Sequence, residues 1–137
     1  MQVYKKILVT IDCSPVDDAI INHIAPLAAQ NHAEVCLLHV AHAHTIDQRR
    51  ALHNRAESCL ETHCEKLRGQ GISAVKIIRD GEPDEQILKE IETGDYDLVA
   101  MATHGHKFFG DILFGSVSES LKHKIRIPLL LIKPERS

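Results

Sequence analysis

Residues 98–118 combine glycines and a hydroxyl group in a spacing that suits the binding of an anion. Gly105 follows an apolar run and a short polar segment, and nine residues separate it from Gly115, which Ser116 follows directly. Glycine lets backbone N–H groups approach a ligand, and the first turn of a helix offers unpaired donors at its positive end. We therefore predict a strand, a phosphate-binding loop and a helix that begins at Ser116. The Ser116 hydroxyl either caps this helix, with Glu119 completing a capping box, or contacts a phosphate.

Two common phosphate-binding motifs do not fit this segment. Gly105 and Gly110 have the spacing that opens a P-loop. The next two residues are Asp111 and Ile112, whereas a P-loop requires Lys followed by Ser or Thr. The dinucleotide pattern G-x-G-x-x-G is absent from the chain. The pattern that remains is a small residue, Ala102, then two residues, Gly, nine residues, Gly and Ser.

Five apolar runs alternate with four helical patterns along the chain. The predicted strands are residues 5–12, 34–40, 72–79, 98–101 and 127–132. The predicted helices start at residues 14, 45, 83 and 116, and the last three of them end at residues 69, 92 and 124. This alternation predicts a single α/β domain over residues 1–137, with a five-stranded parallel sheet, right-handed crossovers and helices on both faces.

The first predicted helix begins with three signals typical of a helix start. Ser14 is an N-cap residue, Pro15 suits the first helical position, and Asp17 places an acid at the third. Apolar residues at every fourth position from Val16 then form a stripe that packs on the sheet. Pro26 lies inside this stripe, so we expect the helix either to kink there or to end early.

The favoured strand order is 3-2-1-4-5, which reverses the winding between the first and the fourth strand. In open α/β sheets, ligands bind at such a reversal, beyond the carboxyl ends of the strands. The loops that follow these two strands contain residues 10–14 and 102–115. The topology and the glycine spacing therefore predict the same crevice as the binding site.

The composition excludes several classes of function. The chain has 137 residues, 44% of them hydrophobic and 26% charged, as in an ordinary globular domain. A net charge of −3 and an aromatic content of 4% argue against a nucleic-acid-binding surface. No apolar run approaches the ~20 residues of a membrane span, and no targeting signal is evident. We therefore expect no membrane partner and a cytoplasmic location.

Neither the cysteines nor the histidines form a known metal-binding motif. Cys13, Cys36, Cys59 and Cys64 contain no C-x-x-C pair, and we interpret them as free thiols. Several of the ten histidines lie near the expected ligand loops, but no acid is spaced to complete a zinc site or a catalytic triad. We expect no catalytic residue and no metal site built from protein side chains alone.

Five short motifs, spread over nearly the whole chain, occur together in one known family. They are K-K-I-L-V-x-x-D-x-S, L-L-H-V, a G-x-P turn, D-L-V-x-M-A-T-H-G and G-S-V-S-E. With the glycine spacing, they make the chain similar to the universal stress proteins. The resemblance implies a Rossmann-like, adenine nucleotide alpha hydrolase-like fold with the order 3-2-1-4-5. It also implies ATP binding, with Mg²⁺ or Mn²⁺ carried by the phosphates, and a homodimer through the last strand, Leu129 to Ile132.

The resemblance also implies roles for individual residues, by their positions in the motifs. Asp12 corresponds to the acid that meets the ribose or a phosphate-bound metal, and Val40 and Met101 correspond to parts of the adenine pocket. The two glycines and the residues after the second one surround the phosphates. The full expected binding set is Thr10, Ile11, Asp12, Val40, Met101, Ala102, Gly105, Gly115, Ser116, Val117 and Ser118.

Three functions are compatible with these residues. The first, which we favour, is an ATP-binding regulator of the stress response with slow or absent hydrolysis. The chain lacks a P-loop lysine, a clear catalytic base and an arginine finger. The second is a dimeric interaction module that does not bind nucleotide, favoured by Ala102 at a glycine position and by the bulky Phe108 and Phe109. The third is a slow ATPase or an autophosphorylating protein.

Overall fold

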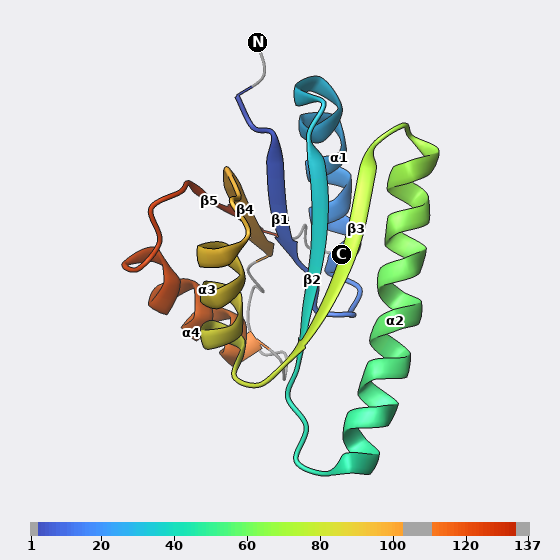
Figure 1. Cartoon of the computed structure of the whole chain (residues 1–137), viewed down its shortest axis with the longest axis vertical. Helices are drawn as coiled ribbons and strands as arrows, with labels where there is room; N and C mark the ends of the chain where they lie inside the picture. Colours follow the sequence, from blue (N-terminus) through green and yellow to red (C-terminus); the bar gives the residue numbers. More distant parts are fainter. Residues whose placement is uncertain (1–2, 103–110, 134–137) are drawn as a thin grey trace.

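A five-stranded parallel sheet forms the centre of the protein, with helices on both faces (Figure 1). The computed structural model describes residues 3–102 and 111–133, and for residues 111–116 it describes the backbone alone. The strands are β1 (Lys6–Thr10), β2 (Glu34–Ala41), β3 (Ser73–Asp80), β4 (Leu98–Ala102) and β5 (Leu129–Ile132). The helices are α1 (Asp17–Asn31), α2 (Ile46–Gly69), α3 (Pro83–Thr93) and α4 (Asp111–Lys122). The sheet order is β3-β2-β1-β4-β5, which confirms the predicted order.

β1 lies at the centre of the sheet and is buried on both faces. Ile7 and Val9 pack in the apolar cluster beneath α1 and α2, whereas Leu8 packs in the cluster beneath α3 and α4. In the two parallel ladders, Leu8 pairs with Cys36 of β2 and with Val99 of β4. A strand covered on both faces has a nearly continuous apolar sequence, which is why the sequence predicts this one well.

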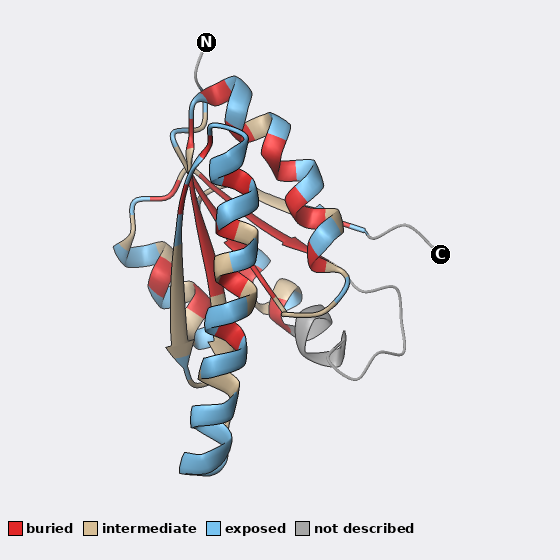
Figure 2. Cartoon of the chain, turned by 90° about the vertical axis from the view of Figure 1, so that its right-hand side faces the viewer, coloured by how far each residue is buried: buried red, intermediate tan, exposed pale blue. Residues whose placement is uncertain are grey.

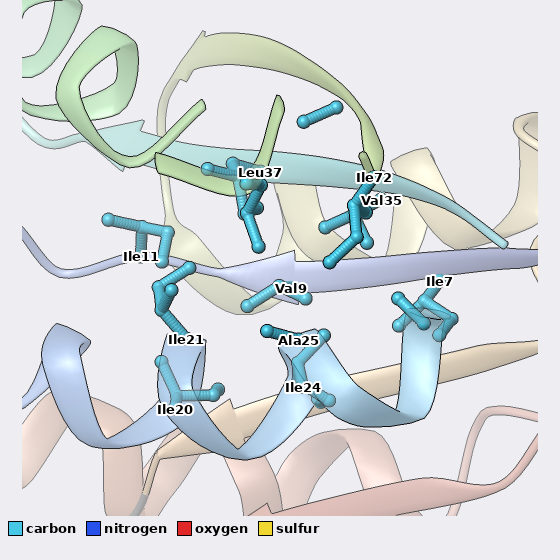
Figure 3. Packing of buried hydrophobic residues seen from close by; sticks show 14 of the residues in the cluster. Ile7, Val9, Ile11, Ile20, Ile21, Ile24, Ala25, Val35, Leu37 and Ile72 are labelled. Carbon is cyan, nitrogen blue, oxygen red and sulfur yellow. The ribbon is translucent and has the colours of Figure 1, made fainter. Parts of the chain in front are cut away.

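α1 packs its apolar stripe against the middle of the sheet (Figure 3). Ile20, Ile21 and Ile24 are fully buried, and they lie on the side of the helix that faces Val9. Burial of a large aliphatic side chain contributes about 1.5–3 kcal/mol relative to exposure. Most of the stability of this helix therefore comes from packing and not from the local preference of its residues.

α2 covers the same face of the sheet beside α1. Its buried residues are Ala56, Leu60, Cys64 and Leu67, while the outward side of the helix is exposed to solvent (Figure 2).

All four cysteines of the chain are free thiols, as predicted. Among the described residues, no helix has an apolar stretch long enough to span a membrane.

The start of α1 differs from the prediction. The helix begins at Asp17, with Val16 as its N-cap residue, and not at Ser14 or Pro15. The preceding residues form a turn in which the Asp17 N–H donates to the carbonyl oxygen of Ser14 at 3.1 Å. The Asp17 carboxylate in turn accepts a hydrogen bond from the Ser14 N–H at 3.2 Å. The side chain that holds the turn is therefore that of Asp17, and the predicted cap at Ser14 is wrong.

Pro26 does not end α1, which continues to Asn31. The expectation of an early end is therefore wrong. Pro26 is exposed, whereas Ile24 and Ala28 on either side of it are buried against the sheet. This burial holds the helix together across the one backbone hydrogen bond that proline cannot make.

α4 begins earlier than predicted. It starts at Asp111 and not at Ser116, so Gly115 and Ser116 lie inside the helix. Ser116 is therefore not the N-cap residue, and the predicted capping box with Glu119 is wrong. A glycine inside the helix costs about 1 kcal/mol relative to alanine, which a packed helix tolerates.

A polar network connects α3 to β3 and to the segment before β4. The Glu90 carboxylate accepts hydrogen bonds from Nε and Nη2 of Arg79, at 3.0 and 2.7 Å, and from the Tyr96 hydroxyl, at 2.7 Å. Glu90 and Tyr96 are buried. Burial favours the neutral acid, but the hydrogen bonds from Tyr96 and Arg79 outweigh it, so the pKa of Glu90 lies below its ordinary value.

We expect the Tyr96→Phe variant to be less stable than the wild type by about 1.5–3 kcal/mol, because the Glu90 carboxylate loses a buried donor. The pKa of Glu90 is lower in the folded state than in the unfolded state. Ionised Glu90 therefore stabilises the fold at pH values above the unfolded-state pKa, about 4.3, and this stabilisation is lost as the pH falls through the lower folded-state pKa. Urea unfolding at neutral pH and at about pH 3 measures both effects, and the difference between the two proteins should narrow at the lower pH.

The control for this variant is Tyr4→Phe, since the Tyr4 hydroxyl makes no hydrogen bond to any described residue. This control is expected to change the free energy of unfolding by less than about 0.5 kcal/mol. An equal loss of stability in the two variants would show that the Tyr96 hydroxyl does not support Glu90.

Candidate functional site

A cavity opens at the carboxyl ends of β1 and β2, on the side of the sheet that α3 and α4 cover. Its volume is about 490 Å³, including the space at its mouth. The residues that line it are Thr10, Ile11, Asp12, Leu38, His39, Val40, His42, Pro83, Ile87 and Val117.

The lining is apolar on the helix side and polar at the end of β1. Ile87 of α3 and Val117 of α4 are buried and form an apolar wall together with Val40 of β2. Thr10 is only 4% exposed, and its hydroxyl has no hydrogen-bond partner among the described residues. A buried polar group without a partner costs about 1–3 kcal/mol, so a ligand that supplies a hydrogen bond is favoured there.

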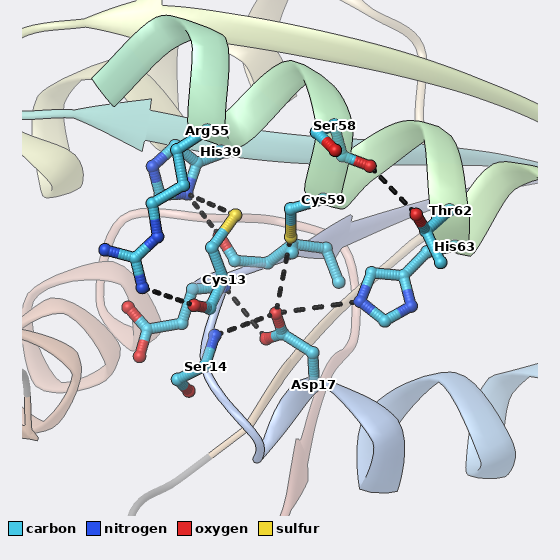
Figure 4. A network of polar contacts seen from close by, with 11 residues as sticks. Cys13, Ser14, Asp17, His39, Arg55, Ser58, Cys59, Thr62 and His63 are labelled. Carbon is cyan, nitrogen blue, oxygen red and sulfur yellow. Dashed lines mark hydrogen bonds and ion pairs between the residues drawn. The ribbon is translucent and has the colours of Figure 1, made fainter. Parts of the chain in front are cut away.

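The loop between β1 and α1 is held by one buried carboxylate. Asp17 is 2% exposed. It accepts hydrogen bonds from the backbone N–H of Asp12 at 2.9 Å and of Ser14 at 3.2 Å (Figure 4). Burial raises the pKa of Asp17 to about 6, against the lowering effect of these backbone donors. The two hydrogen bonds fix the loop that carries Asp12, the one acidic residue in the described lining of the cavity.

A histidine of β2 holds the same loop from the other side. Nδ1 of His39 lies 2.7 Å from the carbonyl oxygen of Ile11, so this nitrogen carries a proton and donates it. The same nitrogen lies 3.8 Å from Sγ of Cys13. Cys13 has a φ of 61°, in the left-handed region of backbone conformation. The loop is thus fixed by side chains from both α1 and β2.

The structure brings part of the expected binding set together around the cavity. The members that line it are Thr10, Ile11, Asp12, Val40 and Val117. Met101 is fully buried in the apolar cluster that also contains Val117, and Ala102 is 6% exposed at the end of β4. Neither Met101 nor Ala102 contributes to the lining of the cavity.

The expected phosphate-binding residues lie in the segment after β4 and in α4. Gly105 falls outside the described residues. Gly115 and Ser116 lie within α4, and the side chain of Ser116 is not among those described. Ser118 is half-buried in the same helix.

Half of the cavity lining was not predicted from the sequence. The additional residues are Leu38, His39, His42, Pro83 and Ile87. A signal for three of them was present, because the motif L-L-H-V contains Leu38 and His39 and the G-x-P turn contains Pro83. Which way a side chain points at a strand end, and where α3 lies relative to β2, depend on tertiary packing that these motifs do not encode. His42 also lies 3.5 Å from the Glu82 carboxylate, at the start of α3.

The fold and the cavity together define an α/β domain with a recess at the carboxyl ends of its central parallel strands, where ligands bind in open α/β sheets. The sequence model of the Universal stress protein family matches residues 3–133. The chain belongs to the universal stress protein family.

Several known proteins are similar to this chain over their whole length. The universal stress protein MJ0577 of Methanocaldococcus jannaschii is 28% identical over 158 residues, which cover 98% of this chain and 98% of that protein. The solved structure of MJ0577 has a TM-score of 0.84 at 30% identity and covers 98% of this chain and 99% of that one.

Two further solved structures contain an adenine nucleotide and share the fold. A universal stress protein from Archaeoglobus fulgidus in complex with dAMP has a TM-score of 0.73 at 18% identity, covering 96% of this chain and 100% of that one. A universal stress protein in complex with cAMP has a TM-score of 0.76 at 15% identity, covering 98% of this chain and 100% of that one.

We expect the Asp17→Ala variant to be less stable than the wild type by about 1.5–3 kcal/mol, because two backbone N–H groups of the β1–α1 loop lose a charged acceptor. Asp18→Ala is the matched control, since Asp18 is the next residue of α1 and is exposed. The control is expected to change stability by less than about 0.5 kcal/mol. Urea unfolding of both variants measures the effect, and a similar loss in the two would show that the loop does not depend on Asp17.

Proposed function

We propose that this protein is a regulator of the stress response that binds ATP in the cavity at the ends of β1 and β2 and hydrolyses it slowly or not at all. One observation carries the proposal: the cavity combines an apolar wall with polar groups of the β1–α1 loop, at the position where α/β sheets bind ligands. The relatives solved with dAMP and cAMP support an adenine nucleotide as the class of ligand.

The groups around the cavity fit the parts of an adenine nucleotide. Val40 and Ile87 offer an apolar surface to the base. Val117, which the family motif places near the phosphates, is a buried part of the same apolar wall and is proposed here to contact the base instead. Asp12 is an acceptor for ribose hydroxyls, or a ligand for Mg²⁺ or Mn²⁺ carried by the phosphates. The unpartnered hydroxyl of Thr10 provides a further hydrogen bond.

In this proposal, the phosphates extend toward the N-terminal part of α4, because free backbone N–H groups at a helix start favour anions. The remaining members of the expected set keep their proposed positions, around the base or the phosphates. They are Met101, Ala102, Gly105, Gly115, Ser116 and Ser118.

The character of the lining favours binding over turnover. Among its described residues there is no Lys or Arg, the side chains that stabilise developing charge in phosphoryl transfer. A bound nucleotide would therefore persist and stabilise one arrangement of the loops around it. In the proposed role, a partner protein recognises this arrangement of the loops.

We expect the Val40→Phe variant to bind adenine nucleotides at least about tenfold more weakly than the wild type, because a larger half-buried side chain fills space that the base needs. The matched control is Val75→Phe, since Val75 is 40% exposed on β3 and does not line the cavity. Isothermal titration calorimetry with AMP, cAMP and Mg²⁺-ATP measures the affinities. Absence of binding by the wild type at millimolar nucleotide, or equal affinities in the two variants, would contradict the proposal.

We further propose that the protein forms a homodimer through β5. This strand is at the edge of the sheet, and its Leu131 is 46% exposed. An apolar side chain on an open edge suits pairing with a second copy of the same strand. This edge also suits the second candidate function, a dimeric module that does not bind nucleotide.

We expect the Leu131→Asp variant to be monomeric at concentrations where the wild type is dimeric, because a charge on β5 would be buried in the interface. Val75→Asp is the control, since Val75 is similarly exposed on β3, the opposite edge of the sheet. Size-exclusion chromatography with light scattering measures the mass. Dissociation by Val75→Asp but not by Leu131→Asp would assign the interface to the other edge, and a dimer without nucleotide affinity would favour the interaction module.

A further inference from the structure

A second group of reactive side chains lies on the face of the sheet that α1 and α2 cover. Sγ of Cys13, the carboxylate of Asp17 and Sγ of Cys59 all lie within 4.8 Å of one another (Figure 4). Cys13 belongs to the β1–α1 loop, Asp17 is the first residue of α1, and Cys59 lies in α2. None of these three residues lines the cavity, so none of them contacts the nucleotide in the function proposed above.

A histidine of α2 adds a fourth metal-binding atom to this group. Nε2 of His63 lies 3.8 Å from Oδ2 of Asp17, and Sγ of Cys59 lies 4.0 Å from the same oxygen. The side chains of Asp17 and His63 are only 3% and 12% exposed. Three potential ligand atoms therefore converge, and a fourth lies against Asp17, in a region that is largely shielded from solvent.

The carboxylate of Asp17 has no basic partner that is permanently charged. Within the part of the chain that the structure describes, its contacts are two backbone N–H groups, a thiol and an imidazole. Arg55 is close, but its Nη2 donates to the carbonyl oxygen of Cys13 at 3.4 Å. A buried carboxylate without a cation is unfavourable, whereas a bound divalent cation would supply the missing charge.

We propose that Cys13, Asp17 and Cys59 form a Zn²⁺ site. His63 supplies the fourth ligand through Nε2. Two sulfurs, a carboxylate oxygen and an imidazole nitrogen are ligands that Zn²⁺ takes in a tetrahedral arrangement. Metal–ligand distances of about 2.0–2.3 Å place tetrahedral ligand atoms roughly 3.3–3.8 Å apart, so small shifts of Cys13, Asp17 and Cys59 are sufficient. His63, which lies 3.8 Å from Asp17, has to move closer to the sulfur atoms to complete the site. On binding, the two thiol protons pass to solvent and two S–Zn bonds take their place.

His39 supports this site without binding the metal. Its Nδ1 is protonated because it donates to the carbonyl oxygen of Ile11, and it lies 3.8 Å from Sγ of Cys13. A donor at this position stabilises a thiolate ligand from outside the coordination sphere. The metal would connect the β1–α1 loop, α1 and α2.

Metal titration of the full chain tests the proposal, with nucleotide omitted so that the result is independent of the cavity. The protein is reduced with a phosphine, freed of metal and titrated with Zn²⁺ against a chromophoric chelator. Co²⁺ then serves as a spectroscopic probe of the ligands. We expect a single equivalent of Zn²⁺ per chain, and for Co²⁺ a sulfur-to-metal charge-transfer band with the intense visible bands of tetrahedral coordination.

Two matched cysteine variants separate a metal site from general binding to thiols. Cys59→Ser removes one sulfur ligand, and we expect it to weaken Zn²⁺ binding by at least about tenfold. Cys64→Ala removes a buried thiol of the same helix that lies outside the group, and we expect it to keep the wild-type affinity. Circular dichroism establishes that both variants are folded.

Absence of a saturable Zn²⁺ site in the wild type would overturn the proposal, as would equal Zn²⁺ affinities of Cys59→Ser and Cys64→Ala. A Cys13–Cys59 disulfide that forms in air, in a protein that takes up no metal once reduced, would also overturn it. The pair would then be a redox couple and not a metal site. Loss of nucleotide binding with an intact Zn²⁺ site would leave this proposal standing and contradict only the function proposed for the cavity.

Discussion

The burial of β1 on both of its faces is the constraint on which the rest of the structure depends. Ile7 and Val9 pack beneath α1 and α2, and Leu8 packs beneath α3 and α4, so neither helical layer can shift without opening a fully packed interior. Hydrogen bonds to β2 and β4 hold the same strand on both edges. The carboxyl end of β1 is thereby a fixed point, and the loop that carries Asp12 starts from it.

The candidate site combines this rigid strand end with elements that come from far along the chain. The polar groups of the cavity lie at the end of β1, whereas its apolar wall is formed by β2, α3 and α4. Such a lining recognises the shape of an apolar group and orients it through few polar contacts. The described part of the lining contains no Lys or Arg, the side chains that stabilise developing charge in phosphoryl transfer.

The sequence predicts the sheet and its order well because most of the strands have an apolar centre and the chain alternates strictly between strand and helix patterns. It predicts helix starts less well. Ser14 and Ser116 have the local preference of cap residues, yet the Asp17 carboxylate holds the first turn, and α4 already begins at Asp111. Local preferences are worth about 1 kcal/mol, so tertiary contacts override them readily.

The candidate site was predictable only in part, for a related reason. Asp12 and Thr10 follow from the topology, since both lie where a central strand ends. Ile87 lines the cavity because of the way α3 packs beside β2, and no spacing in the sequence encodes that contact. His39 stands in the motif L-L-H-V, but the direction of its side chain depends on the same packing. The proximity of Cys13 and Cys59 depends in the same way on how α2 lies across the sheet.

The left-handed backbone of Cys13 has a consequence for how this chain responds to selection. A side chain with a Cβ atom costs roughly 1–2 kcal/mol in this conformation, whereas glycine adopts it freely. Random mutagenesis screened only for heat resistance would thus favour glycine at this position. A variant with glycine at position 13 would be more stable and would lack the Cys13 thiol. If cysteine persisted at position 13 under such a screen, the Cys13 side chain itself would contribute more to stability than its backbone conformation costs.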